Sequence, residues 1–585
     1  MADLRQQPSE HTHTLTPNVH RPRANVPLKC TIMKHFFLLL LILMSGALGV
    51  SAISFNDDVP PEELAENILN AMTDEEALAQ VFMFGWKEWM TGPEPAITEW
   101  ISRRALGGVK VFGWNTEDKQ RPVNTERLAS TIGGFQRLAL RGRFNIPLLV
   151  ATDQEGGPVR HVKGQTSKAP GAMAAGASGY PQDAYLSGYY IGRELAVLGI
   201  NMNFAPTVDL FTNHDTMIGA RSFGDDPVKA GLLGIAFAKG LEAAGVIPTA
   251  KHFPGHGDTP LDSHKFLPKI NIDFDTLWER ELVPYRMLAK EGVPAIMSGH
   301  LAFPKTEANE TPASQSRWFL EDVLRGKTGF KGLIITDDLA MDGATMSAGS
   351  LSRAAKAAFL AGNNIVMMSQ TPAMDEAIWV NLLRDMGTDK EFRSRVRESA
   401  RRVLIVKLKY LKGEKAVPLI PNPERVREEL PDAEGAKFFT DLAVRAVTLV
   451  KNERNVIPLK SSQTESLLFV GDTKEFFKLR DTAYAGASGY GDSTVSAGLM
   501  SRAAAAGTIV FYLNKDAGLD TLRAFRPLGK RIVVISALSP SRLERMDWVD
   551  AVIAVYSDTY ESLAAGFSVM AGKLEARGSI PYKVK

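Results

Sequence analysis

Residues 246–264 read VIPTAKHFPGHGDTPLDSH. The apolar run Val246–Ala250 predicts a buried strand, and the glycines and prolines after it favour a loop. The loop holds three of the chain's ten histidines, together with a lysine and two aspartates. Titratable side chains gathered on a loop beside a buried strand are typical of a catalytic site. The stretch therefore predicts both one strand of the fold and the place of its chemistry.

Seven further apolar runs of strand length alternate with amphipathic segments, of which 183–198 and 228–244 are examples. Eight strands alternating with helices over ~350 residues predict a (β/α)8 TIM-type barrel at 58–412, with a doubly wound open sheet as the alternative. The predicted strands are Val81–Phe84, Gly108–Phe112, Pro147–Thr152, Asn201–Ala205, Val246–Lys251, Ala295–Ser298, Leu333–Thr336 and Ile365–Met368.

Polar residues at the strand ends favour the barrel. At or just after the carboxyl ends of five different predicted strands lie Asp153, Asp209, Lys251–His252, His300 and Asp337. The carboxyl ends of barrel strands share one face, so these side chains would converge on one site. One such residue would be a turn residue or a helix cap, but five of them are poorly explained by caps alone.

A second unit follows the barrel. Prolines bracket a charged stretch that predicts a linker at 413–440, and 441–585 predicts a smaller α/β layered domain with a mainly parallel sheet. The glycine-rich segment Tyr484–Asp492 lacks the lysine and the context of a nucleotide-binding loop and predicts a plain loop. The predicted elements are strands Ala443–Lys451, Leu467–Val470, Thr508–Leu513, Ile532–Ala537 and Ala551–Val555, and helix Tyr560–Ala571.

The first residues predict export. Residues 1–32 are polar and predict a disordered extension, which leaves Met33 as an alternative start. Residues 33–52 contain an apolar run and then small residues, as in a signal peptide cleaved after Ala52, which predicts a secreted or periplasmic protein. An uncleaved anchor is the alternative, although the run is marginal for a ~30 Å hydrocarbon core. The single cysteine, Cys30, precedes this run, so the mature chain would have no disulfide.

Overall charge points to a neutral substrate. Lys+Arg number 68 and Asp+Glu 66, with no basic block that would predict nucleic-acid binding.

Two chemistries could use the histidine loop. His252, His256 and His264 could bind a metal, but a proline and a glycine between the first two argue against the helix that such spacing needs. Alternatively, Asp262 could orient the imidazole of His264 for proton transfer, and the local sequence favours this arrangement.

KHFPGHGDTPLDSH resembles the signature of the β-N-acetylglucosaminidase branch of glycoside hydrolase family 3. The resemblance is strong in the barrel and weaker in the second domain, at 446–460 and 564–581. It implies a retaining, exo-acting enzyme of two domains that needs no metal or cofactor. Further matching segments are ATDQEGG (151–157), NFAPTVDL (203–210), GARSFGDDP (219–227) and MSGHLAFP (297–304).

The resemblance also implies roles for individual residues. Asp337, the first acid of ITDDLAMDG, would be the nucleophile, and His264 with Asp262 would be the acid/base pair. A nucleophilic carboxylate and a proton donor are what retaining glycoside hydrolysis requires, and an ordinary histidine pKa near 6.5 suits the second role. The residues implied to hold the sugar are Asp153, Arg221, Lys251 and His252.

The chain departs from the family pattern at one position. Eight residues after Asp153 the family places a sugar-binding arginine, but this chain has His161 there and Arg160 before it, so both are candidates. The expected partner is a carbohydrate with terminal N-acetylglucosamine, from cell-wall or chitin-type fragments. The alternatives are another family 3 sugar specificity, a glycoside phosphorylase, a metallohydrolase using the histidine cluster, and a catalytically silent sugar-binding protein.

Overall fold

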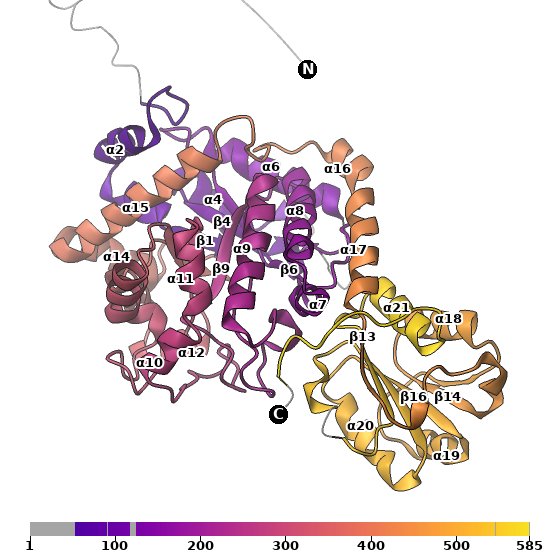
Figure 1. Cartoon of the computed structure of the whole chain (residues 1–585). Helices are drawn as coiled ribbons and strands as arrows, with labels where there is room; N and C mark the ends of the chain where they lie inside the picture. Colours follow the sequence, from indigo (N-terminus) through magenta and orange to yellow (C-terminus); the bar gives the residue numbers. More distant parts are fainter. Residues whose placement is uncertain (1–52, 90–91, 117–123, 544–545, 584–585) are drawn as a thin grey trace, which may run out of the picture. The chain divides into compact units, whose positions relative to one another are not determined.

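A ring of eight parallel strands forms the first part of the fold (Figure 1). The computed structural model describes residues 53–585 apart from 90–91, 117–123, 544–545 and 584–585. The two end strands of the ring, β11 and β12, are joined through a bridge between Ile335 and Ile365, so the barrel is nearly closed. The predicted barrel is confirmed, and the open-sheet alternative is wrong. In spatial order the strands are β11 (Leu333–Thr336), β10 (Ala295–Ser298), β9 (Ile247–Phe253), β8 (Met202–Asn203), β5 (Leu149–Thr152), β4 (Gly108–Val111), β1 (Phe82–Gly85) and β12 (Val366–Met368).

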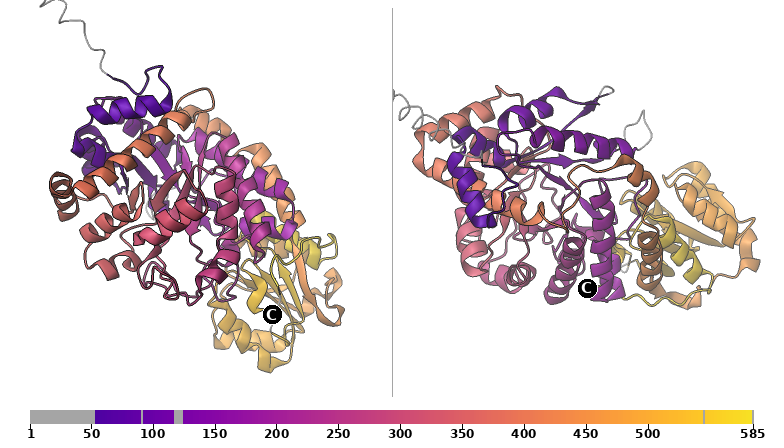
Figure 2. Two further views of the ribbon diagram at one scale, coloured as in Figure 1. Left: turned by 60° about the vertical axis from the view of Figure 1, so that its left-hand side comes forward. Right: turned by 90° about the horizontal axis from the view of Figure 1, so that it is seen from above.

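Helices lie outside this ring, as the two views of Figure 2 show. The connection after β10 is a π-helix, η3 (Trp318–Lys327). Residues Ile53–Lys585 form one compact unit that contains the barrel and the second domain. The helices of the barrel part are α2 (Pro61–Ala71), α3 (Asp74–Gln80), α4 (Pro95–Arg104), α5 (Gly113–Thr116), α6 (Thr125–Ala139), α7 (Ala172–Ser178), α8 (Pro181–Val197), α9 (Pro227–Ala243), α10 (Phe274–Glu279), α11 (Val283–Lys290), α12 (Asp342–Ala348), α13 (Leu351–Ala361), α14 (Ala377–Thr388) and α15 (Lys390–Tyr410).

Helix α9 shows how local sequence sets these boundaries. The Asp226 carboxylate accepts hydrogen bonds from the backbone N–H groups of Val228 and Lys229, and Pro227 occupies the first turn. An aspartate cap followed by proline is a favoured helix start. Gly245, with φ of +82°, follows the helix and turns the chain into β9. The strand that leads to the histidine loop is therefore placed by a capped helix.

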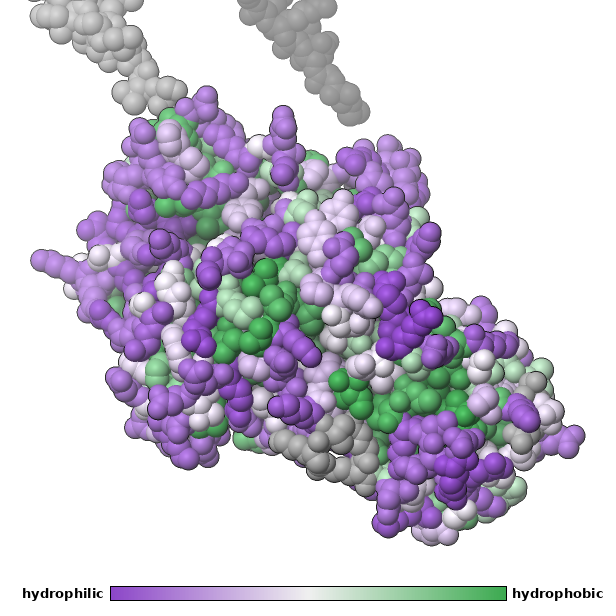
Figure 3. Space-filling model, in the orientation of Figure 1, coloured by the Kyte–Doolittle hydropathy of each residue, from purple (hydrophilic) through white to green (hydrophobic). Residues whose placement is uncertain are grey.

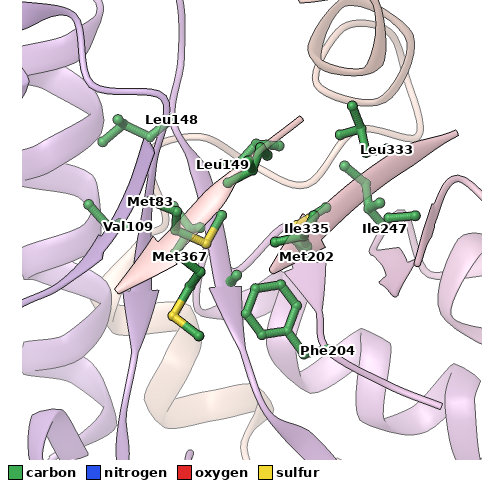
Figure 4. Close-up of a cluster of buried hydrophobic side chains, with 14 of the residues drawn as sticks. Met83, Val109, Leu148, Leu149, Met202, Phe204, Ile247, Leu333, Ile335 and Met367 are labelled. Carbon is green, nitrogen blue, oxygen red and sulfur yellow. The ribbon is translucent and has the colours of Figure 1, made fainter. Parts of the chain in front are cut away.

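The interior of the barrel is filled by apolar side chains (Figure 4). Met83, Leu149, Met202, Ile247 and Ile335 are all fully buried, and they come from five different strands. Parallel strands covered by helices read as continuous apolar runs, which is why the strands were visible in the sequence. The barrel is a packed core, and polar chemistry is confined to its ends.

Strand β9 is longer than predicted. It continues past its predicted end at Lys251 through His252 to Phe253, so Lys251 and His252 both lie on the strand. Backbone hydrogen bonds hold this end, from Val208 N to Lys251 O at 2.9 Å and from Lys251 N to Pro206 O at 3.0 Å. Sheet pairing overrides the local signal of polar residues, and it fixes both side chains on a rigid element.

The second domain is built on a six-stranded sheet with helices on both faces. Strand β13 is antiparallel to β18 and the other pairs are parallel, which confirms the predicted mainly parallel sheet. In spatial order the strands are β13 (Thr448–Asn452), β18 (Ala551–Ala554), β17 (Arg531–Ser536), β16 (Thr508–Leu513), β14 (Leu467–Val470) and β15 (Ser488–Tyr490). The helices are α18 (Lys474–Ala483), α19 (Ala497–Ala505), α20 (Gly518–Ala524) and α21 (Tyr560–Met570).

Three local predictions differ from the structure. The run Ala443–Lys451 is not one strand, because its first four residues end helix α17 (Ala433–Ala446). The predicted loop Tyr484–Asp492 contains the edge strand β15, which is stabilised by pairing with β14. The predicted linker 413–440 contains helix α16 (Pro423–Glu429) and the start of α17. In each case an amphipathic or glycine-rich segment takes its structure from the surface against which it packs.

The predicted extension 1–32 and signal peptide 33–52 lie outside the described residues. Over the part of the chain that the structure describes, no helix combines the length and the hydrophobicity needed to cross a membrane. The face shown in Figure 3 is largely hydrophilic and is interrupted by smaller apolar patches.

Candidate active site at the carboxyl end of the barrel

Asp153 follows β5 and is buried at the mouth of the barrel. Its carboxylate pairs with Nζ of Lys251 on β9, and its other oxygen lies 2.7 Å from Nζ of Lys110 on β4. Burial alone would raise the pKa of Asp153, but the two ammonium groups and His161 hold it well below its usual range. Three strands thus contribute to one carboxylate that stays charged.

Glu155, on the short strand β6 (Gln154–Gly156), extends this arrangement. Its two oxygens accept hydrogen bonds from Arg221 Nε at 2.9 Å and Nη2 at 2.7 Å, and one lies 2.7 Å from Lys251 Nζ. Burial would raise the pKa of Glu155, but Arg221 and Lys251 lower it to about 2. We refer to Asp153, Glu155, Lys110, Lys251 and Arg221 as the buried charge network.

His252 is oriented by a carboxylate of its own. Its Nδ1 lies 2.7 Å from Asp209 Oδ2, and Asp209 also accepts the backbone N–H of His256 at 2.7 Å. Burial would raise the pKa of Asp209, and His252 lowers it below its usual value. A ring that donates from Nδ1 to a carboxylate keeps Nε2 as an acceptor, so His252 is set to receive a hydrogen bond from a substrate hydroxyl.

Asp337 begins the loop after β11 and is partly exposed. Its backbone N–H donates to Ser298 O at 2.9 Å. Burial would raise the pKa of its carboxyl, but His252, His300 and Lys251 contribute to lowering it to about 2. A charged, accessible carboxylate beside a lysine and two histidines has the properties of a nucleophile.

Asp338 is placed differently from its neighbour. Its Oδ1 accepts backbone hydrogen bonds from Ala340 and Ser369, both at 3.0 Å, and its carbonyl oxygen lies 3.1 Å from His300 Nε2. These contacts tie the turn after β11 to the turn after β12. The Asp338 carboxylate is therefore engaged in hydrogen bonds with backbone N–H groups. By contrast, the only hydrogen bond to Asp337 Oδ1 within the described residues comes from Asp338 N, at 2.8 Å.

The pair formed by Asp262 and His264 is present but exposed. His264 Nδ1 lies 2.7 Å from Asp262 Oδ1, and 71% of the histidine side chain is exposed to solvent. The loop is held at Ser263, whose Oγ lies 3.0 Å from His256 Nε2. Among the described residues no contact joins the His264 ring to Asp337, so the structure does not bring the predicted acid/base pair and nucleophile together.

His161 and Arg160 point to different parts of the molecule. His161 Nδ1 lies 3.5 Å from Asp153 Oδ2, and burial lowers the pKa of His161 to about 4 despite the Asp153 charge. Arg160 Nη2 instead lies 3.8 Å from Asp558 of the second domain. The substituted position, His161, therefore joins the buried charge network as a neutral ring.

The three histidines of the metal alternative do not converge. His252 contacts Asp209, His256 contacts Ser263, and His264 contacts Asp262. No group of three or more His, Cys, Asp or Glu side chains is placed to hold a metal ion anywhere in the described ranges between 53 and 583.

Two members of the buried charge network were not among the predicted site residues. Lys110 is a charged residue inside the apolar run GVKVF, and Glu155 stands in the matched segment ATDQEGG. A buried lysine within a strand requires a carboxylate partner, so Lys110 in its apolar run could have indicated a buried ion pair at this end of the barrel. Asp209 and His300 were recognised as residues at strand ends, but they were given no function.

Together these features define the class: a (β/α)8-barrel enzyme with a carboxylate site at the carboxyl face of its strands. Residues 73–406 match the glycosyl hydrolase family 3 N terminal domain. The match covers more than half of the chain, so the protein belongs to glycosyl hydrolase family 3 and is a glycoside hydrolase. The resemblance seen in the sequence is confirmed.

Individual relatives agree with this assignment. Beta-hexosaminidase A of Pseudoalteromonas piscicida is 32% identical over 417 residues, 67% of each chain. A beta-hexosaminidase of Tolumonas auensis is 36% identical over 283 residues, covering 48% of this chain and 80% of the relative. The structure of a family 3 beta-N-acetylglucosaminidase from Paenibacillus has a TM-score of 0.77 at 26% identity, with 88% and 99% coverage. A fungal multi-domain beta-N-acetylglucosaminidase has a TM-score of 0.79 at 27% identity, and this protein spans 61% of that chain.

Proposed function

We propose that the protein is a retaining, exo-acting β-N-acetylglucosaminidase that releases terminal N-acetylglucosamine from cell-wall or chitin-type fragments. The observation that carries the proposal is the Asp337 carboxylate at the end of β11, kept charged beside Lys251, His252 and His300. The relatives that are named beta-hexosaminidases and beta-N-acetylglucosaminidases support the choice of sugar.

The reaction proceeds in two steps. In the first, an Asp337 oxygen attacks the anomeric carbon while the protonated His264 ring gives its Nε2 proton to the leaving oxygen, which forms a glycosyl ester and frees the aglycone. In the second, the neutral ring takes a proton from water as that water attacks the same carbon, and the ester bond to Asp337 breaks. Two inversions give retention. Asp262 accepts the Nδ1–H bond throughout and keeps the ring oriented.

The exposed position of His264 implies a movement. In the mechanism its Nε2 must come within hydrogen-bonding distance of the leaving oxygen, about 2.6–3.2 Å. The loop 258–266 therefore closes over the bound sugar and excludes bulk water while the glycosyl ester forms, and the water of the second step enters once the aglycone has left. The loop is anchored at its base by Arg280, whose Nη2 donates to Asp258 at 2.5 Å.

Sugar recognition belongs to the buried charge network and to His252. Carboxylates and cations that already hold one another in fixed positions present charged hydrogen-bonding groups to hydroxyls without reorganising. The neutral His161 ring beside Asp153 takes the place of the usual arginine. A site of this kind rejects analogues that lack a partner group, because its own polar atoms are left unpaired.

We also propose that the protein acts outside the cytoplasm, as a secreted or periplasmic enzyme. Support comes from the signal-peptide pattern at 33–52 and from the neutral charge balance, which suits an uncharged glycan and not a nucleic acid. Fractionation of cells that produce the full chain, with sequencing of the mature N-terminus, tests this part of the proposal.

A panel of chromogenic β-glycosides, run with and without phosphate, tests the activity. We expect N-acetyl-β-glucosaminide to be cleaved far faster than β-glucoside, with no acceleration by phosphate and with β-configured free sugar as first product. Chitooligosaccharides should lose one residue at a time from the non-reducing end. Random internal cleavage, equal use of β-glucoside, or a sugar phosphate product would each contradict the proposal.

A further inference from the structure

The last described segment, 578–583, returns from the second domain to the mouth of the barrel (Figure 1). Pro581 O accepts a hydrogen bond from Asp225 N at 3.2 Å, and Lys583 N donates to Asp225 Oδ2 at 2.8 Å. Asp225 lies in the loop 211–225, between β8 and α9. Two backbone groups of the segment thus hold one residue of a barrel loop.

Aromatic packing strengthens this attachment. Tyr582 is 6% exposed, and its ring centroid lies 4.7 Å from that of Phe211 and 5.6 Å from that of His214. Phe211 N donates to Gly224 O at 2.9 Å, which joins the two ends of the loop 211–225. The tyrosine therefore packs on the loop at the point where the loop closes on itself.

The segment 578–583 approaches the loop 211–225 so closely that position 224 requires a glycine. A Cβ at Gly224 would lie 2.1 Å from Pro581 O, and the φ of Gly224 is +142°, a region that side-chain-bearing residues rarely adopt. At this position the loop conformation and the contact with the segment therefore depend on the same residue.

Arg221 lies inside the clamped loop, between Phe211 and Asp225. Its guanidinium holds Glu155 in the buried charge network, and the next residue, Ser222, donates from Oγ to Asp209 O at 2.7 Å. The loop is thus connected on one side to the carboxylates of the proposed sugar site and on the other side to the second domain.

We infer that the segment 578–583 positions Arg221, so that the second domain sets the affinity of the barrel for its sugar. Tyr582 and the Pro581 carbonyl are positioning groups that act through the loop 211–225. The effect on sugar binding rests on the proposed function. A shift of the guanidinium by a fraction of an ångström would weaken its bond to Glu155 and alter the network that faces the substrate.

The first test compares two tyrosine substitutions in the second domain. Tyr582→Ala removes the ring that packs on the loop, whereas Tyr560→Ala, the control, removes a half-exposed ring on α21 whose described aromatic contact is Lys478. We expect Tyr582→Ala to lower kcat/KM on an N-acetyl-β-glucosaminide about tenfold, mainly through KM. Tyr582→Phe, which keeps the ring, should restore most of it, and Tyr560→Ala should leave it unchanged.

A double-mutant cycle separates positioning from general stability. In an Arg221→Lys background the two-donor contact with Glu155 is already lost, so Tyr582→Ala should cost less than twofold in kcat/KM. Independent, multiplicative losses would overturn the inference, as would a Tyr582→Ala enzyme with lowered thermal stability but unchanged KM.

A measurement without substrate keeps the inference apart from the proposed function. Hydrogen exchange of the intact protein should show faster exchange in 211–225 for Tyr582→Ala than for Tyr560→Ala, with the strands β5 and β9 unchanged. Unchanged exchange in the loop would overturn the positioning role. If the loop exchanges faster in Tyr582→Ala but the wild-type protein cleaves no N-acetylglucosaminide, the positioning role of the segment is supported and the proposed substrate is rejected.

Discussion

The buried charge network and the Asp262–His264 pair are the two halves of the proposed catalytic apparatus, and they differ most in solvent exposure. The Lys251 side chain is 2% exposed, and the His264 side chain is 71% exposed. Most of the network sits on strands and strand ends that the barrel holds rigid, with Arg221 on the clamped loop 211–225, whereas the pair sits on an exposed loop. The contrast indicates that sugar recognition is organised before binding and that proton transfer is completed only when the loop closes.

The largest effect is expected at the carboxylate that both halves serve. Asp337→Ala should lower kcat by at least about 10⁴-fold, because it removes the carboxylate that forms the glycosyl ester in the proposed mechanism. Steady-state kinetics with an aryl N-acetyl-β-glucosaminide measures the loss. The control is Asp338→Asn, which keeps an oxygen to accept the Ala340 and Ser369 N–H groups and should retain activity.

Labelling gives an independent check on the nucleophile. A mechanism-based fluorosugar should attach to the peptide that contains Asp337. If the label is found on another peptide, or if Asp338→Asn is the inactive variant, the assignment is wrong.

The buried half should be costly to disturb. Lys251→Met leaves Asp153 and Glu155 with one cation fewer in a buried place, and losing one partner of a buried ion pair costs about 3–5 kcal/mol. Thermal unfolding and calorimetric binding of N-acetylglucosamine should both report the loss. Lys265→Met, an exposed lysine on the loop, is the matched control and should change stability by less than about 0.5 kcal/mol. Equal losses of stability for Lys251→Met and Lys265→Met would mean that the buried lysine contributes no more than an exposed one.

Acid should weaken the buried half through Glu155. Its pKa in the folded protein is about 2, against an ordinary 4.5. A lowered folded-state pKa stabilises the protein fully above the ordinary value and loses that stabilisation as pH falls toward the folded value, a contribution on the order of 3 kcal/mol. The difference in thermal midpoint between the wild type and Glu155→Gln should therefore be largest above pH 5 and shrink toward pH 2.5. A difference that is constant with pH would contradict the charged state of Glu155.

The smallest effect on stability is expected in the exposed half. His264→Ala should change the free energy of unfolding by less than about 0.5 kcal/mol, since the ring is largely in solvent. It should slow substrates with poor leaving groups about a hundredfold, and activated aryl glycosides much less, because the latter need little protonation. Equal losses on both kinds of substrate would indicate a binding role instead. Loss of wild-type activity in chelator, with recovery in zinc, would favour the metal alternative.

The barrel strands could be predicted from the sequence more completely than the edge strand, the short helix and the strand end that lie around them. All eight barrel strands were predicted near their observed positions, because a strand buried on both faces must be apolar along its whole length. Strand β15 and helix α16 were missed, because a glycine-rich edge and a short charged helix carry little local signal and gain their stability from neighbours. The extension of β9 beyond Lys251, through His252 to Phe253, was missed for the same reason.

By itself the sequence determined the barrel, the strand ends that carry polar residues, and the family, since each of these is written in local patterns of apolar runs and motifs. Only the tertiary structure decided which of those residues meet. It brought Lys110 and Glu155 into the buried charge network, assigned His161 to Asp153 and Arg160 to the second domain, and left His264 in solvent. Charge pairing depends on distances between strands far apart in the chain, and burial decides which pairs remain ionised.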